Sequence, residues 1–142
     1  MTNSSLAQSY LVKSRHRLKV LDLLIAEGAF SDVVREAQEV VELASKAMLR
    51  EVAIEPPKWH DVGQLLQEHD HRFPGSVRAE VPALVDASAW LRKEREFSFY
   101  GDIDFIPTER YGRDDAERAR AAARLAVRLA AAVVDQPGRP RD

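Results

Sequence analysis

The helical spacing of the apolar residues is the feature that most constrains the fold of this chain. Apolar side chains recur every three or four residues along most of the sequence, as they do on the buried face of a helix. One such stripe runs from Ala7 to Ile25, and a second runs from Val34 to Met48. No segment alternates apolar and polar residues over a useful length, as a half-buried strand does. The spacing therefore predicts an all-α fold.

Turn and capping residues divide this pattern into separate helices. Gly28 ends the first helix, and Ser31 is a natural N-cap for the second. Pro56 and Pro57 stop the second helix, because a proline has no amide hydrogen to donate to a helix. A short helix is then predicted from about Trp59 to Glu68. Such short connections favour helices that run antiparallel to their neighbours.

Two further long helices flank a segment that has no period. The fourth helix is expected along an apolar stripe formed by Val77, Val81, Leu84, Ser88 and Leu91. Pro82 is expected in the first turn of this helix, which would then begin later than the stripe. Residues 100–112 lose the helical period and are predicted to form a loop. The fifth helix begins near Asp114, and its inward residues are nearly all small: Ala116, Ala119, Ala123, Val127 and Ala130. Small side chains let two backbones approach closely, so this helix is predicted to pack tightly.

These elements predict one domain. The chain has 142 residues, which is an ordinary length for a single domain. We expect an antiparallel bundle of four long helices and one short helix over residues 1–135. Residues 136–142 are polar and contain proline, so a flexible C-terminal tail is expected there.

The composition excludes several classes of protein. The sequence has no Cys, which rules out disulfides and thiolate metal sites. It has no apolar run of the length of a membrane span, and its N-terminus is polar, so we expect a cytoplasmic protein without a membrane partner. The formal net charge of −2 argues against a general binder of nucleic-acid backbones.

Two groups of polar side chains have a structural and a functional interpretation. Four arginines of the fifth helix form either a solvated face or an anion-facing stripe: Arg118, Arg120, Arg124 and Arg128. His69 and His71 flank Asp70, but residues two apart on a helix face different directions, so no metal site is predicted. The sequence also lacks a phosphate-binding glycine loop, and no cofactor is expected.

Three ordered stretches of the chain resemble a known family. Residues 35–50 read REAQEVVELASKAMLR, residues 56–63 read PPKWHDVG, and residues 95–102 read REFSFYGD. Tyr111 and the run Asp114-Asp115-Ala116 follow them. In this order they resemble the second helix, the proline-containing turn, the end of the fourth helix, the loop and the start of the fifth helix in the HEPN family (higher eukaryotes and prokaryotes nucleotide-binding domain). The likeness spans nearly the whole chain.

The resemblance implies a small helical bundle that forms a homodimer and is often encoded beside a minimal nucleotidyltransferase. Many members of the family are metal-independent ribonucleases, including toxins of toxin–antitoxin pairs. Their motif is an arginine that is followed, after four to six residues, by a histidine near the end of the fourth helix. The arginine neutralises the scissile phosphate and the histidine moves protons, while the 2′-hydroxyl of the RNA is the nucleophile. The dimer brings two such motifs together.

This chain has the arginine of the motif without its histidine. Arg95 stands at the arginine position, but the spacings of the motif lead to residues 100–102, which are Tyr, Gly and Asp. Counted from Arg92, the same spacings lead to residues 97–99, which are Phe, Ser and Phe. No histidine follows His71 in the chain. A phenol with an ordinary pKa of about 10 is a poor general base at neutral pH, and loss of a proton-transfer group costs roughly 100- to 10,000-fold in rate. The ribonuclease motif is therefore degenerate.

The end of the fourth helix holds the candidate site residues. Arg95, Tyr100 and Asp102 occupy the positions that the resemblance marks as catalytic, and Arg92, Arg95 and Tyr100 are predicted to bind a nucleotide or RNA. A structural interpretation of the same residues is a helix end, with an arginine near the C-terminus, Gly101 at the C′ position and Asp102 paired with an arginine.

We expect a dimeric nucleotide- or RNA-binding partner in a nucleotidyltransferase-linked system of the toxin–antitoxin kind. The first alternative is an active, metal-independent endoribonuclease toxin in which Tyr100 replaces the histidine. The second is a structural helical adaptor that binds no nucleotide. Cleavage of RNA in the presence of EDTA separates the first alternative from the others, and calorimetry with nucleotides separates the second.

Overall fold

The described part of the chain is built from helices. The computed structural model describes residues 2–56 and 62–135. Its helical elements, in order, are α1 (Asn3–Ala26), α2 (Phe30–Glu51), α3 (Val62–Glu68), the 3-10 turn η1 (Asp70–Arg72), α4 (Gly75–Arg78), α5 (Val81–Phe99), α6 (Pro107–Arg110) and α7 (Arg113–Val134). An isolated bridge between Asp102 and Phe105 is the nearest approach to a strand among these residues. The all-α prediction is confirmed.

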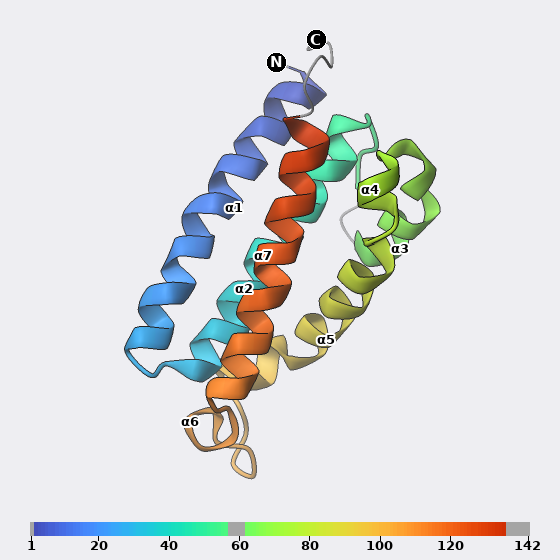
Figure 1. Cartoon of the computed structure of the whole chain (residues 1–142). Helices are drawn as coiled ribbons and strands as arrows, with labels where there is room; N and C mark the ends of the chain where they lie inside the picture. The colour runs from blue at the N-terminus through green and yellow to red at the C-terminus, as the bar shows by residue number, and fades with distance from the viewer. Residues whose placement is uncertain (1, 57–61, 136–142) are drawn as a thin grey trace.

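Helix α2 lies at the centre of an antiparallel bundle. The four long helices α1, α2, α5 and α7 run up and down alternately, and α3 and α4 lie beside the upper part of the bundle in Figure 1. Helix α2 contacts α1, α5 and α7, and 13 of its 22 residues are buried. The half-buried charged residues Asp32, Arg35, Glu36 and Glu39 of α2 face the side on which α1 and the end of α5 lie.

The small residues of α7 allow the close packing that their sequence predicts. The five inward residues named above are all buried, and α7 contacts both α1 and α2 along its length. Ala119 and Ala123 have no exposed surface at all. Because an alanine has only a methyl group, α7 can approach its neighbours without leaving gaps or clashing with them.

The helix boundaries differ from the predictions in two places. Helix α2 begins at Phe30 with Ala29 at its N-cap, so the prediction that Ser31 caps it is wrong. The connection from α1 is so short that Ser31 already lies inside α2, where it is buried. At its other end α2 stops at Glu51, because Ala53 adopts a φ of 62° and the amide of Ile54 donates to the carbonyl of Leu49.

The fourth apolar stripe spans two helices instead of one. Val77 is buried as predicted, but it belongs to α4, and α5 begins only at Val81. Pro82 has no amide hydrogen, and its ring would clash with the carbonyl of Arg78 in a continuous helix. The bundle thus holds more than one short helix, since α3 and α4 lie between α2 and α5, and α6 interrupts the predicted loop.

Some predictions concern residues that the structure does not describe. Pro57, the start of the short helix at Trp59 and the tail over residues 136–142 lie outside the described ranges.

Candidate functional site

A hydrogen bond to a glutamate carboxylate joins Arg95 to the central helix α2. Arg95 lies on α5, and its Nη2 atom donates to Oε1 of Glu39 on α2 at 2.9 Å. The two side chains keep 44% and 30% of their surface exposed. The hydrogen bond therefore orients both side chains, and both remain accessible to solvent.

Glu39 was not among the residues predicted from the sequence. It follows Asp32 by seven residues and Arg35 by four, so these side chains form a polar stripe on one face of α2. That spacing is visible in the sequence, but the partner of Glu39 lies 56 residues further on. The spacing therefore gave no sign of the contact.

The other predicted residues do not gather around Arg95. Tyr100 is 76% exposed, and its ring packs edge-on against Phe99 with the centroids 4.6 Å apart. Oδ1 of Asp102 accepts from the amide of Ile103 at 2.6 Å. No hydrogen bond, ion pair or ring contact joins Arg95 to Tyr100 or to Asp102 in the described part of the chain. Their assignment as site residues stays a prediction.

The helix-end interpretation is correct in one respect and wrong in another. Gly101 follows the C-cap of α5 with a φ of 67°, as expected for a C′ glycine. A Cβ at this position would meet the carbonyl of Phe105 and would come within 2.6 Å of the ring of Pro107. Asp102, however, binds the amide of Ile103 and no arginine of the described residues, because the tight turn after Gly101 brings that amide next to its carboxylate.

Arg92 lies one turn before Arg95 on α5. Residues three apart on a helix share a face, so the two guanidinium groups emerge on the same side. Both side chains are exposed.

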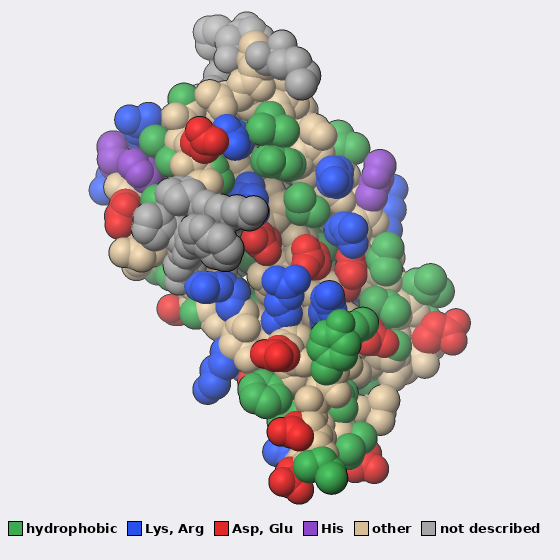
Figure 2. Space-filling view, turned by 180° about the vertical axis from the view of Figure 1, so that it is seen from behind, with side chains coloured by type: hydrophobic (Ala, Val, Ile, Leu, Met, Phe, Trp, Pro, Cys, Tyr) green, Lys and Arg blue, Asp and Glu red, His purple; other side chains and the backbone are tan. Residues whose placement is uncertain are grey.

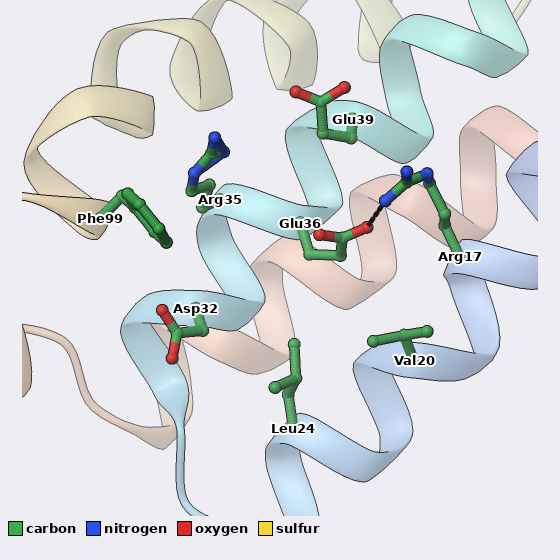
Figure 3. Close-up of a pocket in the computed structure, with 8 residues that line it drawn as sticks. All are labelled: Arg17, Val20, Leu24, Asp32, Arg35, Glu36, Glu39 and Phe99. Atoms are coloured by element: carbon green, nitrogen blue, oxygen red, sulfur yellow. Dashed lines mark hydrogen bonds and ion pairs between the residues drawn. The ribbon is translucent and has the colours of Figure 1, made fainter.

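A cleft opens next to the Arg95–Glu39 pair. It has a volume of about 610 Å³ and lies between α1, α2 and the end of α5. Figure 3 shows its lining residues: Arg17, Val20 and Leu24 from α1, Asp32, Arg35, Glu36 and Glu39 from α2, and Phe99 from α5. The sequence alone gave no sign of this cleft, although Arg35, Glu36 and Glu39 of its lining lie within the stretch 35–50 that carries the family resemblance. Its volume falls in the range of small-molecule sites.

The charged side chains of the cleft make different kinds of contact. Nη1 of Arg17 donates to Oε1 of Glu36 at 2.5 Å, and this hydrogen bond holds the pKa of Arg17 above its ordinary value. The guanidinium of Arg35 lies over the ring of Phe99, 4.2 Å from the centroid. Asp32 lies on the same side of α2, one turn before Arg35 (Figure 3).

Exposed apolar side chains surround the end of α5 and the loop that follows. We call this group the end patch; it consists of Phe97 (46% exposed), Tyr100 (76%), Ile103 (86%) and Ile106 (41%). Figure 2 shows hydrophobic side chains at the lower end of the molecule, where this loop lies in Figure 1. Large apolar side chains at such exposure mark an interaction surface when they occur together.

The arginines of α7 lie on a solvated face, as one of the two interpretations above has it: Arg118, Arg124 and Arg128 are exposed, and Arg120 is half-buried. Arg120 binds Asp22 at 2.8 Å, Arg128 binds Glu80 with two hydrogen bonds of 2.8 Å, and Arg118 stacks over the ring of Trp90. These contacts join α7 to α1 and to α5 on the surface of the bundle.

Metal-binding and membrane-spanning features are absent from the described residues. No group of three or more potential metal ligands occurs there, and the rings of His69 and His71 lie 6.4 Å apart. None of the described helices combines the length and the apolar character that crossing a bilayer requires.

A buried tyrosine ties the loop to α5. The hydroxyl of Tyr111 donates to Oε2 of Glu94 at 2.8 Å, and its ring meets Phe105 edge-on. Burial and, next, the hydrogen bond to Glu94 raise the pKa of the Tyr111 phenol well above its ordinary value. The folded protein thus favours the neutral phenol.

Replacing Tyr111 by Phe should lower the free energy of unfolding by about 1.5 kcal/mol at pH 7, because one hydrogen bond to a carboxylate is lost. The raised pKa also predicts a pH dependence. Below pH 10 or so the contribution of the neutral phenol is fully present; above it the unfolded chain releases the proton first, so the stability falls as the pH rises. The free energies of unfolding of the wild type and of Tyr111→Phe, measured with urea, should therefore converge between pH 8 and pH 11. A constant difference over that range would contradict this assignment.

A family model described as HEPN domain matches residues 7–133 of the chain. No curated protein and no solved structure matches it significantly.

Proposed function

Because the chain belongs to the HEPN domain family, we propose that it is a dimeric protein that binds RNA or a nucleotide at the end of α5 without efficient cleavage. The family gives it a function related to nucleotides or RNA. The observation that carries the proposal is the Arg95–Glu39 pair, because Glu39 lines an open cleft of suitable size and binds the guanidinium of Arg95. We further propose that it works beside a nucleotidyltransferase in a system of the toxin–antitoxin kind.

The chemistry of Arg95 suits a phosphate. A guanidinium has five N–H donors, and Glu39 engages one nitrogen, so donors remain for phosphate oxygens. Glu39 also fixes the side chain, which lowers the conformational entropy lost on binding. Arg92 adds a second positive charge one turn away.

Binding without efficient cleavage is favoured by the position of Tyr100. A general base has to come within hydrogen-bond reach of the proton that it removes. The Tyr100 ring packs on Phe99 and makes no contact with Arg95. Asp102 is occupied by the amide of Ile103. The residues that follow Arg95 therefore offer no group poised beside its guanidinium for proton transfer.

The end patch supports a dimer. It begins at Phe97, two residues after Arg95 on α5, so a second copy that covers it would bring a second Arg95 close to the first. Two guanidinium groups could then act on one strand of RNA. Covering the patch would also remove four large apolar side chains from water.

An RNA-binding experiment tests the proposal. The purified protein is mixed with end-labelled, single-stranded RNA in EDTA, and bound and cleaved RNA are separated on native and denaturing gels. We expect a retarded complex and intact RNA. Rapid cleavage that disappears in Arg95→Ala would instead establish the endoribonuclease. An absence of both binding and cleavage would leave the structural adaptor. Co-purification with a nucleotidyltransferase encoded beside the protein tests the paired system.

Replacing Ile103 by Glu should weaken the dimer at least tenfold, because each copy would bury a charge in the interface. Ile103 is 86% exposed in the single chain, so the fold should not change. Sedimentation equilibrium measures the dissociation constant. The matched control is Leu23→Glu, which alters an apolar side chain of α1 that is 60% exposed and lies outside the end patch. Equal dimerisation of the wild type and Ile103→Glu would show that the end patch is not the interface.

A further inference from the structure

Two charged groups of the cleft between α1, α2 and α5 form no ion pair within residues 2–56 and 62–135. Arg17 and Glu36 bind one another, and Glu39 binds Arg95. Asp32 and Arg35, in contrast, form no ion pair with any of the residues that the structure describes, and they form none with each other. A half-buried carboxylate and a half-buried guanidinium that is stacked on Phe99 thus face the same cleft without an ion pair among the described residues.

The walls of the cleft suit a flat ring. Phe99 stands on the α5 side with Arg35 stacked on it, and Val20 and Leu24 stand on the α1 side (Figure 3). Unpaired bases of RNA are bound in this way, between aromatic or apolar side chains and guanidinium planes. The volume of the cleft is large enough for one base and its sugar.

The Asp32 carboxylate and the Arg35 guanidinium can distinguish among the bases. A carboxylate accepts hydrogen bonds only, and a guanidinium donates them only. Guanine alone offers two adjacent donors, N1–H and the N2 amino group, beside the acceptors O6 and N7. Adenine would turn its N1 lone pair toward the carboxylate, and cytosine and uracil each have a single donor group on that edge.

We propose that this cleft is a base pocket that prefers guanine, with Asp32 accepting from N1–H and the N2 amino group, Arg35 donating to O6 or N7, and Phe99 supporting the ring. The inference rests on the proposed function, since the phosphate beside the bound base lies at Arg95, which Glu39 joins to the cleft. It adds a preference that the phosphate contact alone does not supply, because a phosphate carries no information about sequence.

Short RNAs of one length test the preference. The wild type is titrated with fluorescent uridine heptamers whose central base is guanine, adenine, cytosine or uracil. The guanine heptamer should bind about tenfold more tightly than the others, as expected for one bidentate contact to a base. In Asp32→Asn the advantage of the guanine heptamer over the all-uridine heptamer should fall below about twofold, because an amide cannot accept from both guanine donors.

Asp86→Asn is the matched control, because Asp86 is an exposed carboxylate on α5 that does not line the cleft. It should keep the full preference, and thermal melts of both variants should show that the fold is intact. Equal binding of all four heptamers by the wild type, or a guanine preference that survives in Asp32→Asn, would overturn the base pocket and leave the proposed function standing. Failure of every heptamer to bind would overturn the proposed function itself.

Discussion

Replacing Arg95 by Ala should weaken RNA binding by about 100-fold. A hydrogen-bonded contact to a charged group contributes about 1.5 kcal/mol, and the dimer contains two copies of Arg95, so about 3 kcal/mol is lost. The same change leaves Glu39 without its cation beside the bound phosphate, which adds repulsion. Titration of labelled RNA at several salt concentrations measures the effect. The slope of log K against log salt should fall by about 1.4, since each phosphate contact to a single strand contributes about 0.7.

The stability of Arg95→Ala should change little. The Arg95–Glu39 pair is partly exposed, and such pairs contribute about 0–1 kcal/mol. Arg128→Ala is the matched control, because Arg128 also binds one glutamate, Glu80, at 2.8 Å on the surface of the bundle. It should bind RNA like the wild type. Unchanged binding by Arg95→Ala, or an equal loss in Arg128→Ala, would show that Arg95 is not the phosphate site.

Replacing Ala123 by Leu should destabilise the bundle by about 2–3 kcal/mol, the usual cost of overpacking a well-packed core. Ala123 has no exposed surface, and it lies on the face of α7 that packs against the other long helices. A leucine side chain would have to push α7 away from its neighbours. For a domain of this size the melting temperature should fall by roughly 6–10 °C. Thermal unfolding followed by circular dichroism measures the change.

The same substitution two residues away is its control. Ala121 lies on the exposed face of α7, so Ala121→Leu adds the same side chain without entering the core. Alanine and leucine have similar helix propensities, and the melting temperature of this variant should stay within about 2 °C of the wild type. Equal melting temperatures for the two variants would mean that the small residues of α7 do not set its distance from the bundle.

The long helices could be predicted from the sequence because each of them depends on its own local pattern. The stripes from Ala7 to Ile25 and from Val34 to Met48 lie on buried faces of α1 and α2, with Leu18 only partly buried. The boundaries were less accurate, because a short connection at Ala29 and the left-handed Ala53 leave no strong signal in a sequence. Pro82 gave such a signal, and it does lie in the first turn of α5, which begins at Val81.

The sequence by itself determined the helical bundle, its tightly packed last helix and the family to which it belongs, because periodicity and short motifs are properties of neighbouring residues. Only the tertiary structure decided what Arg95 faces. Its partner Glu39 lies on another helix, and the cleft beside them needs α1, α2 and the end of α5 together. Contacts of this kind depend on how helices are rotated and spaced, and that is set by packing across the whole bundle.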